Sequence, residues 1–227
     1  DLANRILDAA QMHVPFDGWS ETAFRAAAED AGVSVQVARG LFPRGALDMA
    51  VASHRAGDAA MTERLAQMDL SAMRYSERVA FAVRNRIELV GDRETVRRGT
   101  TLFALPQHAA EGARLLWGTA DAIWTALGDT SRDLNWYTKR MTLSGVYSST
   151  LLYWLGDDSL DGQATWSFLD RRIEDVMRIE KAKSAVRDNR LLKPLMAGPE
   201  WLASRVRAPR PGREAGLPGS WNPGRRG

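Results

Sequence analysis

The chain has 227 residues, 44% hydrophobic and 26% charged, which is an ordinary composition for a globular protein with a sizeable buried core. It has no cysteine, which excludes disulfides, thiolate metal sites and a cysteine nucleophile, and its three histidines lack the spacing of a metal cluster. No apolar run approaches the length of a membrane span, and the opening residues contain no apolar signal core.

The net charge of +3 conceals an asymmetry along the chain. Residues 183–227 carry ten Lys and Arg against three Asp and Glu, a net charge of +7, so residues 1–182 sum to −4. The basic character therefore belongs to the C-terminal segment. Such a segment favours an anionic partner, which is a lipid surface, a nucleic acid or an acidic protein.

Helical periodicity runs through the chain as far as residue 207 and β-branched alternation is missing, so we expect an all-α fold. The first helix is predicted over 3–14, stopping at Pro15, and the next two begin at the capping residues Ser20 and Ser34. Later helices are predicted over 45–68, 75–90, 93–105, 108–127, 132–155, 160–181 and 184–207. We divide the chain into a helix-turn-helix region (1–52), a helical bundle (53–182), an amphipathic helix (183–207) and a disordered basic tail (208–227) rich in Pro, Gly and Arg.

Residues 20–51 carry the pattern of a helix-turn-helix. Ala28 and Ala31 allow two helices to cross closely, and Gly32 supplies the sharp turn between them. Together with the L-F-P-x-x-x-L motif at 41–47, this stretch resembles the tetracycline-repressor (TetR) family of transcriptional regulators.

The third helix lacks the residues that read DNA. Only Gln36 and Arg39 could contact a duplex, where DNA-binding TetR members carry a basic residue and a Tyr-His pair. Residues 20–56 hold four basic and four acidic residues, whereas a DNA-binding surface needs uncancelled positive charge. We therefore expect the helix-turn-helix to serve as a packing unit whose third helix no longer reads DNA, and we expect no nucleic-acid partner. The alternative is a TetR-type ligand-responsive transcriptional regulator.

The segment 184–207 is amphipathic on a helical wheel. Its apolar residues fall within one arc and its Arg and Lys outside, the pattern of a helix lying in a membrane interface. Pro194 and Pro199 predict a kink or a break in it. The alternative is a helix that docks its apolar stripe on the body. The predicted membrane-binding residues are Leu191, Leu192, Leu195, Met196, Trp201, Leu202, Arg205 and Val206.

Large apolar side chains and small residues are interleaved over residues 102–154. Small residues between helices leave room for an apolar guest, although an ordinary core would have the same stripe. On the cavity interpretation, the ligand-binding residues are Phe103, Leu116, Trp117, Trp124, Met141, Val146, Tyr147 and Trp154.

One face of the helix predicted over 132–155 groups a distinctive set of polar and aromatic residues: Asp133, Trp136, Tyr137 and Arg140. Another face carries four residues that can enter the core, namely Leu134, Met141, Gly145 and Leu152. Trp, Tyr and Arg dominate binding hot spots, which favours a partner-binding face. A half-buried Trp beside a local Asp–Arg pair is the equally open alternative.

Several strings resemble the accessory lipid-binding proteins of coenzyme Q (ubiquinone) biosynthesis. They are R-D-L-N-W-Y-T-K-R at 132–140, M-T-L-S-G-V-Y-S-S-T at 141–150 and T-W-S-F-L-D-R-R-I at 165–173. The shorter strings R-I-L-D-A-A at 5–10 and F-D-G-W-S at 16–20 fit as well. These strings and the segments between them extend over most of residues 3–207.

The resemblance implies a TetR-like fold that has given up DNA binding, with a pocket for an isoprenoid quinone or phospholipid and a terminal helix that reaches the membrane. It implies that the face at 133–140 binds the di-iron demethoxyubiquinone hydroxylase, and that the chain forms homodimers. We find no catalytic motif and predict no enzyme activity, cofactor or metal site. The expected location is the cytoplasmic face of a bacterial inner membrane, peripherally bound, or the mitochondrial matrix side in a eukaryote.

Overall fold

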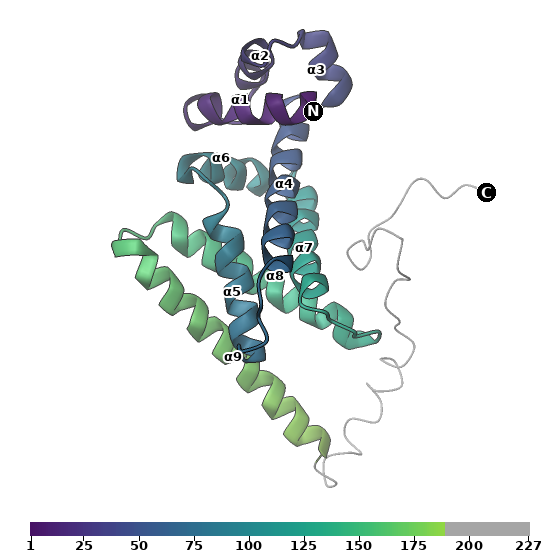
Figure 1. Cartoon of the computed structure of the whole chain (residues 1–227), viewed down its shortest axis with the longest axis vertical. Coiled ribbons are helices and arrows are strands. Elements are labelled where there is room, and N and C mark those ends of the chain that lie inside the picture. Colours follow the sequence, from purple (N-terminus) through teal and green to yellow (C-terminus); the bar gives the residue numbers. More distant parts are fainter. Residues whose placement is uncertain (189–227) are drawn as a thin grey trace, which may run out of the picture.

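The computed structural model describes the backbone of residues 1–188 and the side chains of residues 1–179. Within that part the chain is helical throughout (Figure 1). The elements are α1 (Leu2–Asp17), α2 (Glu21–Asp30), α3 (Val35–Leu41), α4 (Ala46–Ala66), α5 (Tyr75–Glu88), α6 (Arg93–Ala104), α7 (Ala109–Ala126), α8 (Leu134–Leu155), the 3-10 turn η1 (Leu160–Gly162) and α9 (Gln163–Asp188). The all-α prediction is confirmed.

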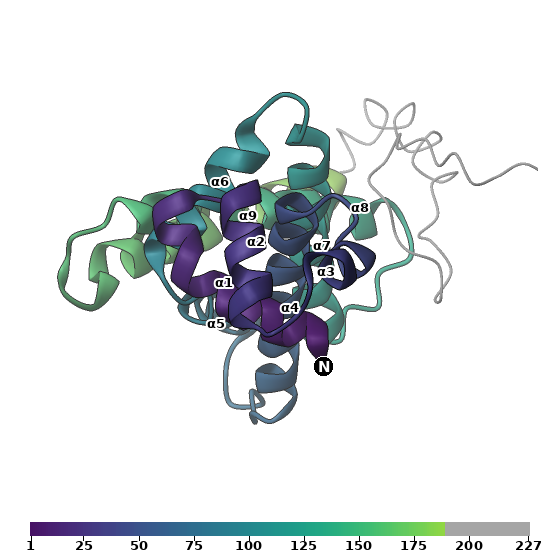
Figure 2. The same cartoon turned by 90° about the horizontal axis from the view of Figure 1, so that it is seen from above.

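Local signals set the first three helices. The Ser20 hydroxyl accepts a hydrogen bond from the Ala23 backbone N–H at 3.2 Å, and the Ser34 hydroxyl accepts one from Val37 at 3.3 Å, so both predicted caps are confirmed. Gly32 forms the turn with φ +64°. These three helices cluster at one end of the molecule (Figures 1 and 2).

The predicted end of the first helix at Pro15 is wrong, because α1 continues to Asp17. Proline in the last turn removes only one hydrogen bond from the helix, and its neighbours supply others. The Gly18 N–H donates to the Val14 carbonyl at 2.9 Å, and Arg98 of α6 donates to the Pro15 carbonyl at 3.3 Å.

Two cores lie one after the other along α4. The first joins α1, α2 and α3 through fully buried Ile6 and Phe24, and Met49 of α4 completes it. The second is formed by α4, α5, α7, α8 and α9 around residues such as Val83 and Ile123. Since α4 contributes to both, it ties the N-terminal helices to the bundle, and the boundary predicted after residue 52 falls inside it.

The last described helix is longer than predicted. α9 runs unbroken from Gln163 to Asp188, so the break expected near residue 182 is not present there. It lies along α5 and α8 at the edge of the bundle (Figure 1). All eight predicted membrane-binding residues, from Leu191 to Val206, lie outside the described residues. None of the described helices combines the length and apolar character needed to cross a bilayer.

Candidate functional site

A cavity of about 840 Å³ opens among α4, α5, α6, α7 and α8, with the α1–α2 corner at its edge. This volume is within the range of small-molecule sites. Small residues from three helices make the room, including Gly57, Gly99 and Ala113. Gly112 lets α6 and α7 meet closely, because a Cβ there would lie 2.8 Å from the Cβ of Phe103.

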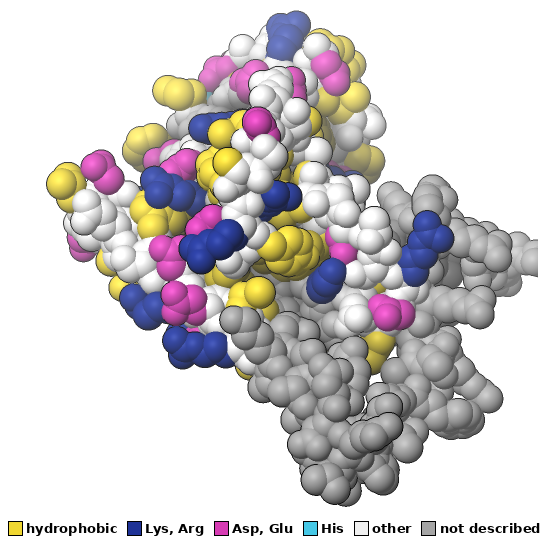
Figure 3. All heavy atoms as spheres, turned by 60° about the horizontal axis from the view of Figure 1, so that its bottom comes forward, with side chains coloured by type: hydrophobic (Ala, Val, Ile, Leu, Met, Phe, Trp, Pro, Cys, Tyr) yellow, Lys and Arg dark blue, Asp and Glu magenta, His cyan; other side chains and the backbone are white. Residues whose placement is uncertain are grey.

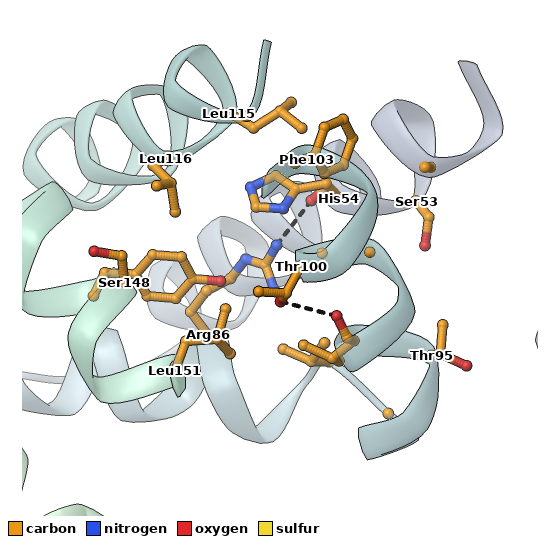
Figure 4. A pocket seen from close by; sticks show the side chains of 18 of the residues that line it. Ser53, His54, Arg86, Thr95, Thr100, Phe103, Leu115, Leu116, Ser148 and Leu151 are labelled. Carbon is orange, nitrogen blue, oxygen red and sulfur yellow. Dashed lines mark hydrogen bonds between the residues drawn. The ribbon is translucent and has the colours of Figure 1, made fainter. Parts of the chain in front are cut away.

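Most of the cavity wall is apolar. Phe103 comes from α6, Leu115 and Leu116 from α7, and Leu151 from α8, and they surround the space in Figure 4. Thr95 and Thr100 of α6 add hydroxyl groups, of which the Thr100 hydroxyl donates to the Val96 carbonyl at 3.0 Å. The wall therefore suits a largely apolar guest.

Arg86 lines the floor of the cavity and is held there by an ion pair. The side chain of Arg86 on α5 is 2% exposed, and its Nε donates to Asp58 of α4 at 2.7 Å. Its Nη2 donates to the His54 carbonyl at 2.9 Å, the contact drawn in Figure 4. Gly57 makes space for the guanidinium, because a Cβ at that position would lie 2.8 Å from both Cζ and Nη1 of Arg86.

Neutral polar groups surround this ion pair. The Thr119 hydroxyl donates to Asp58 at 2.8 Å, and the His54 Nε2 lies 2.9 Å from that hydroxyl oxygen. Burial lowers the pKa of His54 from 6.5 to about 4, and burial also raises the pKa of the Tyr147 phenol. Both side chains are therefore uncharged at neutral pH, so the floor offers hydrogen bonds without a net charge.

The predicted ligand-binding residues do not all meet in one place. Phe103, Leu116 and Tyr147 line the large cavity, whereas Trp124 and Val146 line a smaller one of about 300 Å³ among α5, α7, α8 and α9. The other three lie outside both: Trp117 is buried against Trp136, Trp154 is half-buried beneath Arg93, and Met141 is 61% exposed.

A second buried arginine organises the start of α8. The Nε of Arg140 donates to Asp121 of α7 at 2.5 Å, and its Nη1 donates to Asp129 at 3.1 Å. The ammonium of Lys139 donates to Asp129 at 2.7 Å. Burial raises the pKa of Asp129, but hydrogen bonds from Lys139, Ser131 and Arg140 outweigh that effect and lower it to about 2.

Aromatic rings cover this second ion-pair cluster. The Arg140 guanidinium lies 3.9 Å from the ring centroid of Trp136, which meets Tyr137 edge-on at 4.8 Å and Trp117 at 5.8 Å. Of the predicted partner face, Asp133 is exposed and Tyr137 half-buried, but Trp136 and Arg140 point inward with exposures of 8% and 2%.

The prediction of which α8 face enters the core is therefore wrong. Leu134, Met141 and Leu152 are 41%, 61% and 57% exposed, and Gly145 is exposed as well. The carboxylates of Asp121 and Asp129 attract Arg140 inward, and this fixes the rotation of α8 about its axis. The partners were missed because they lie 19 and 11 residues away from Arg140 in the sequence.

No sequence motif indicated the polar floor of the large cavity either. One signal was present, since His54 and Asp58 are four residues apart on one helix, the spacing that brings side chains together. Arg86 follows 28 residues after Asp58, and nothing local indicates that α5 carries it to the same point.

Basic residues around α3 are tied to acidic neighbours. Arg39 pairs with Glu21 and lies 4.5 Å from the ring centroid of Phe24, while Arg44 contacts Asp48 at 2.6 Å and Glu111 at 2.9 Å. On the face shown in Figure 3, Lys and Arg likewise stand among Asp and Glu and form no single basic field. These contacts agree with a helix-turn-helix that serves as a packing unit.

The fold is that of the TetR regulators. The crystal structure of a TetR transcriptional regulator from Nitrosomonas europaea superposes with a TM-score of 0.62 at 18% identity, covering 76% of this chain and 95% of that one. At that identity the likeness concerns the fold alone.

Sequence comparison finds similarity to one group of proteins. Residues 109–180 match the COQ9 family model. The ubiquinone biosynthesis protein COQ9 of Drosophila melanogaster is 35% identical over 183 residues, and the rat and human proteins are 31% and 30% identical over 186 residues each. Each match covers 78% of this chain, which spans 55%, 59% and 58% of those relatives. The chain is thus similar to COQ9 proteins over more than three quarters of its length, and the predicted resemblance is confirmed.

Proposed function

We propose that this chain serves ubiquinone biosynthesis as a lipid-binding accessory protein without catalytic activity of its own. It holds an isoprenoid quinone intermediate or a phospholipid in the cavity among α4–α8 and presents it to the di-iron demethoxyubiquinone hydroxylase. The observation that carries the proposal is an apolar-walled cavity of about 840 Å³ in a chain similar to COQ9 proteins. The relatives are named as biosynthesis proteins and not after a reaction.

The physical benefit of such a cavity is large. Exposing an isoprenoid tail to water costs about 0.8 kcal/mol for each CH₂ group, so a polar head leaves the bilayer only if its tail stays dry. The wall formed by Phe103, Leu116 and Leu151 provides that surface, and the polar floor provides partners for the head.

Extraction of bound lipid tests the proposal directly. Native mass spectrometry of the purified full chain should detect about one lipid per cavity. Ala60→Trp, which places an indole in the cavity, should remove it, while Ala59→Trp on the neighbouring position of α4, which does not line the cavity, should not. A lipid-free wild-type protein, or equal retention in both variants, would contradict the proposal.

The start of α8 is the proposed hydroxylase-binding surface. Asp133 and Tyr137 reach solvent there, and the buried Trp136 and Arg140 hold them in place. Tyr137→Ala should weaken hydroxylase capture and leave the lipid content unchanged. Tyr153→Ala, an aromatic at the far end of the same helix, is the matched control. Trp136→Ala is a poorer test because Trp136 is a core residue.

The exposed apolar stripe on α8 is the proposed homodimer surface. Leu134, Met141 and Leu152 project from it, and a Cβ at Gly145 would meet nothing within 4 Å, which leaves room for a second helix. Met141→Glu should convert a dimer to a monomer in light-scattering measurements. A wild-type monomer would contradict this part of the proposal.

Membrane attachment completes the proposal. The basic C-terminal segment attaches the chain to an anionic membrane, on the cytoplasmic face of a bacterial inner membrane or the matrix side in mitochondria. The relatives are named as mitochondrial proteins. Flotation of the full chain with vesicles containing anionic lipid should be lost in Leu191→Asp/Leu195→Asp.

The TetR fold favours one other function, a ligand-responsive transcriptional regulator. The ion pairs that engage Arg39 and Arg44 count against it, since a duplex would have to displace them. Specific duplex binding with a steep salt dependence would establish the regulator instead.

A further inference from the structure

The smaller cavity among α5, α7, α8 and α9, of about 300 Å³, has no part in the function proposed above. It shares no lining residue with the large cavity. Ile173, Val176 and Met177 of α9 close one side of it, where α9 packs along α5 and α8 (Figure 1). Since a cavity of about 150 Å³ holds a benzene molecule, this one has room for a substituted aromatic ring but not for a long isoprenoid tail.

Trp124 of α7 brings an unused hydrogen-bond donor to the smaller cavity. Its side chain lines the space and is 7% exposed, and its Nε1 has no hydrogen-bond partner among the described residues. Burying an N–H group without an acceptor costs free energy, so such groups are rare in folded proteins and need an explanation. An oxygen acceptor bound in the cavity would supply the missing contact.

The residues next to Trp124 favour an aromatic guest. Tyr75 stacks on the indole with ring centroids 5.8 Å apart, and the ammonium of Lys139 lies 5.4 Å from the indole centroid. Both residues line the cavity, together with Leu143 and Met177. Rings pair favourably with other rings, and a methionine sulfur contacts ring edges, so an aromatic molecule gains from these neighbours beyond its burial.

The charge at this cavity is already balanced. Among the lining residues that the structure describes, only Lys139 is ionised at neutral pH. Its ammonium donates to the Asp129 carboxylate at 2.7 Å and to the Ser131 hydroxyl at 2.8 Å. An anionic ligand would compete with Asp129 for that ammonium, whereas a neutral oxygen would leave the pair intact. The cavity therefore favours an uncharged ligand.

We propose that the smaller cavity is a second ligand site, which binds a compact aromatic molecule carrying an uncharged oxygen acceptor. The Trp124 indole N–H donates to that oxygen, and the ring packs beside Tyr75 and Met177. The site is separate from the lipid-binding cavity, so either one can be occupied without the other.

Three probes that differ in one group test the site. The ketone para-fluoroacetophenone has a carbonyl where para-fluoroethylbenzene has a methylene, and para-fluorobenzoate has a carboxylate. Fluorine NMR of the purified full chain measures the affinity for each of them. Wild type should bind the ketone about fivefold more tightly than the hydrocarbon, the ratio that one hydrogen bond of ordinary net strength gives. It should also bind the ketone more tightly than the carboxylate.

Trp124→Phe keeps an aromatic ring and removes the indole N–H, so it should bind the ketone and the hydrocarbon equally well. Trp117→Phe is the matched control and should keep the fivefold preference. Trp117 lies on the same helix, is 3% exposed, lines neither cavity, and its Nε1 likewise has no partner within the described part of the chain.

Two filling variants locate the bound probe. Thr142→Trp places an indole in the smaller cavity and should abolish binding of the ketone. Ala60→Trp fills the large cavity and should leave that binding unchanged. Loss of binding in Ala60→Trp but not in Thr142→Trp would put the probe in the large cavity and overturn the inference.

Circular dichroism shows whether each variant folds. The inference is also overturned if wild type does not bind the ketone, if it binds the hydrocarbon or the carboxylate as tightly, or if folded Trp124→Phe keeps the preference. Should Trp124→Phe not fold, the wild-type preference and the two filling variants decide. The lipid content of the purified chain is a separate measurement, so the lipid-binding function stands or fails independently of these results.

Discussion

Arg86 and Arg140 are both 2% exposed, and both hold carboxylates from other elements, yet they serve different ends. Arg140 is bound by Asp121, Asp129 and the Trp136 carbonyl and is covered by an indole ring. Arg86 has one carboxylate and one carbonyl, and it borders a cavity. The comparison shows that a buried charged side chain whose hydrogen bonds all go to the protein stabilises the fold. A buried charged side chain that lines a cavity can also bind a ligand.

The largest expected effect is the loss of Arg140. Arg140→Met leaves two carboxylates without their shared cation, one of which is 2% exposed, and should lower the free energy of unfolding by about 3–5 kcal/mol. Urea unfolding measures this, with exposed Arg132→Met as the control. Arg86→Met should cost less, because it leaves one carboxylate without its cation instead of two, and Asp58 is 15% exposed. An equal cost would contradict the distinction between the two arginines.

Acid should affect the two clusters at different pH. The pKa of His54 is about 4 in the folded state and 6.5 in the unfolded state, so the unfolded chain binds the extra proton as the pH falls between these values. Stability should therefore drop by about 3 kcal/mol from pH 6.5 to 4, at 1.36 kcal/mol per pKa unit. The Asp129 cluster, with a pKa of about 2, should weaken only below pH 3.8.

The variant His54→Gln isolates this pH effect. It should remove the slope in unfolding free energy between pH 6.5 and 4 and leave the loss below pH 3.8 in place. A slope unchanged by the substitution would mean that another group titrates in this range.

A pair of glycine substitutions gives the smallest effect and tests the packing of Arg86. Gly57→Ala places a methyl group against the guanidinium and should destabilise by about 1–3 kcal/mol, despite the better helix propensity of alanine. Gly118→Ala on α7 meets nothing within 4 Å and should instead stabilise by about 0.5–1 kcal/mol. Thermal unfolding of the two variants compares them, and shifts of the same sign would contradict this description of the floor.

Local chemistry made much of the helix pattern predictable. Ser20, Ser34 and Gly32 mark helix ends through contacts a few residues away, so the sequence alone locates them. The rotation of α8 was not predictable in this way. Its apolar residues form a stripe that would suit a core, but Asp121 and Asp129 draw the opposite face inward, and only the folded chain brings them to Arg140.

The cavity, too, could be predicted only in part from the sequence. Interleaved small residues indicated that space could exist, and Phe103, Leu116 and Tyr147 do line it. Its chemical character depends on Asp58 and Arg86, which come from two helices and meet only because Gly57 lets the guanidinium approach α4. Neither the composition nor the periodicity of the sequence indicates that the side chains of Asp58 and Arg86 come together.

The course of α4 has a mechanical consequence. Met49 lies in the N-terminal core, and Gly57 lines the cavity on the same uninterrupted helix, about 12 Å further along at 1.5 Å per residue. Because α4 is one continuous helix that packs in both cores, it cannot tilt in one core without also moving in the other. Any tilt of α4 at the cavity would therefore also move the three N-terminal helices, which gives those helices a mechanical link to the cavity.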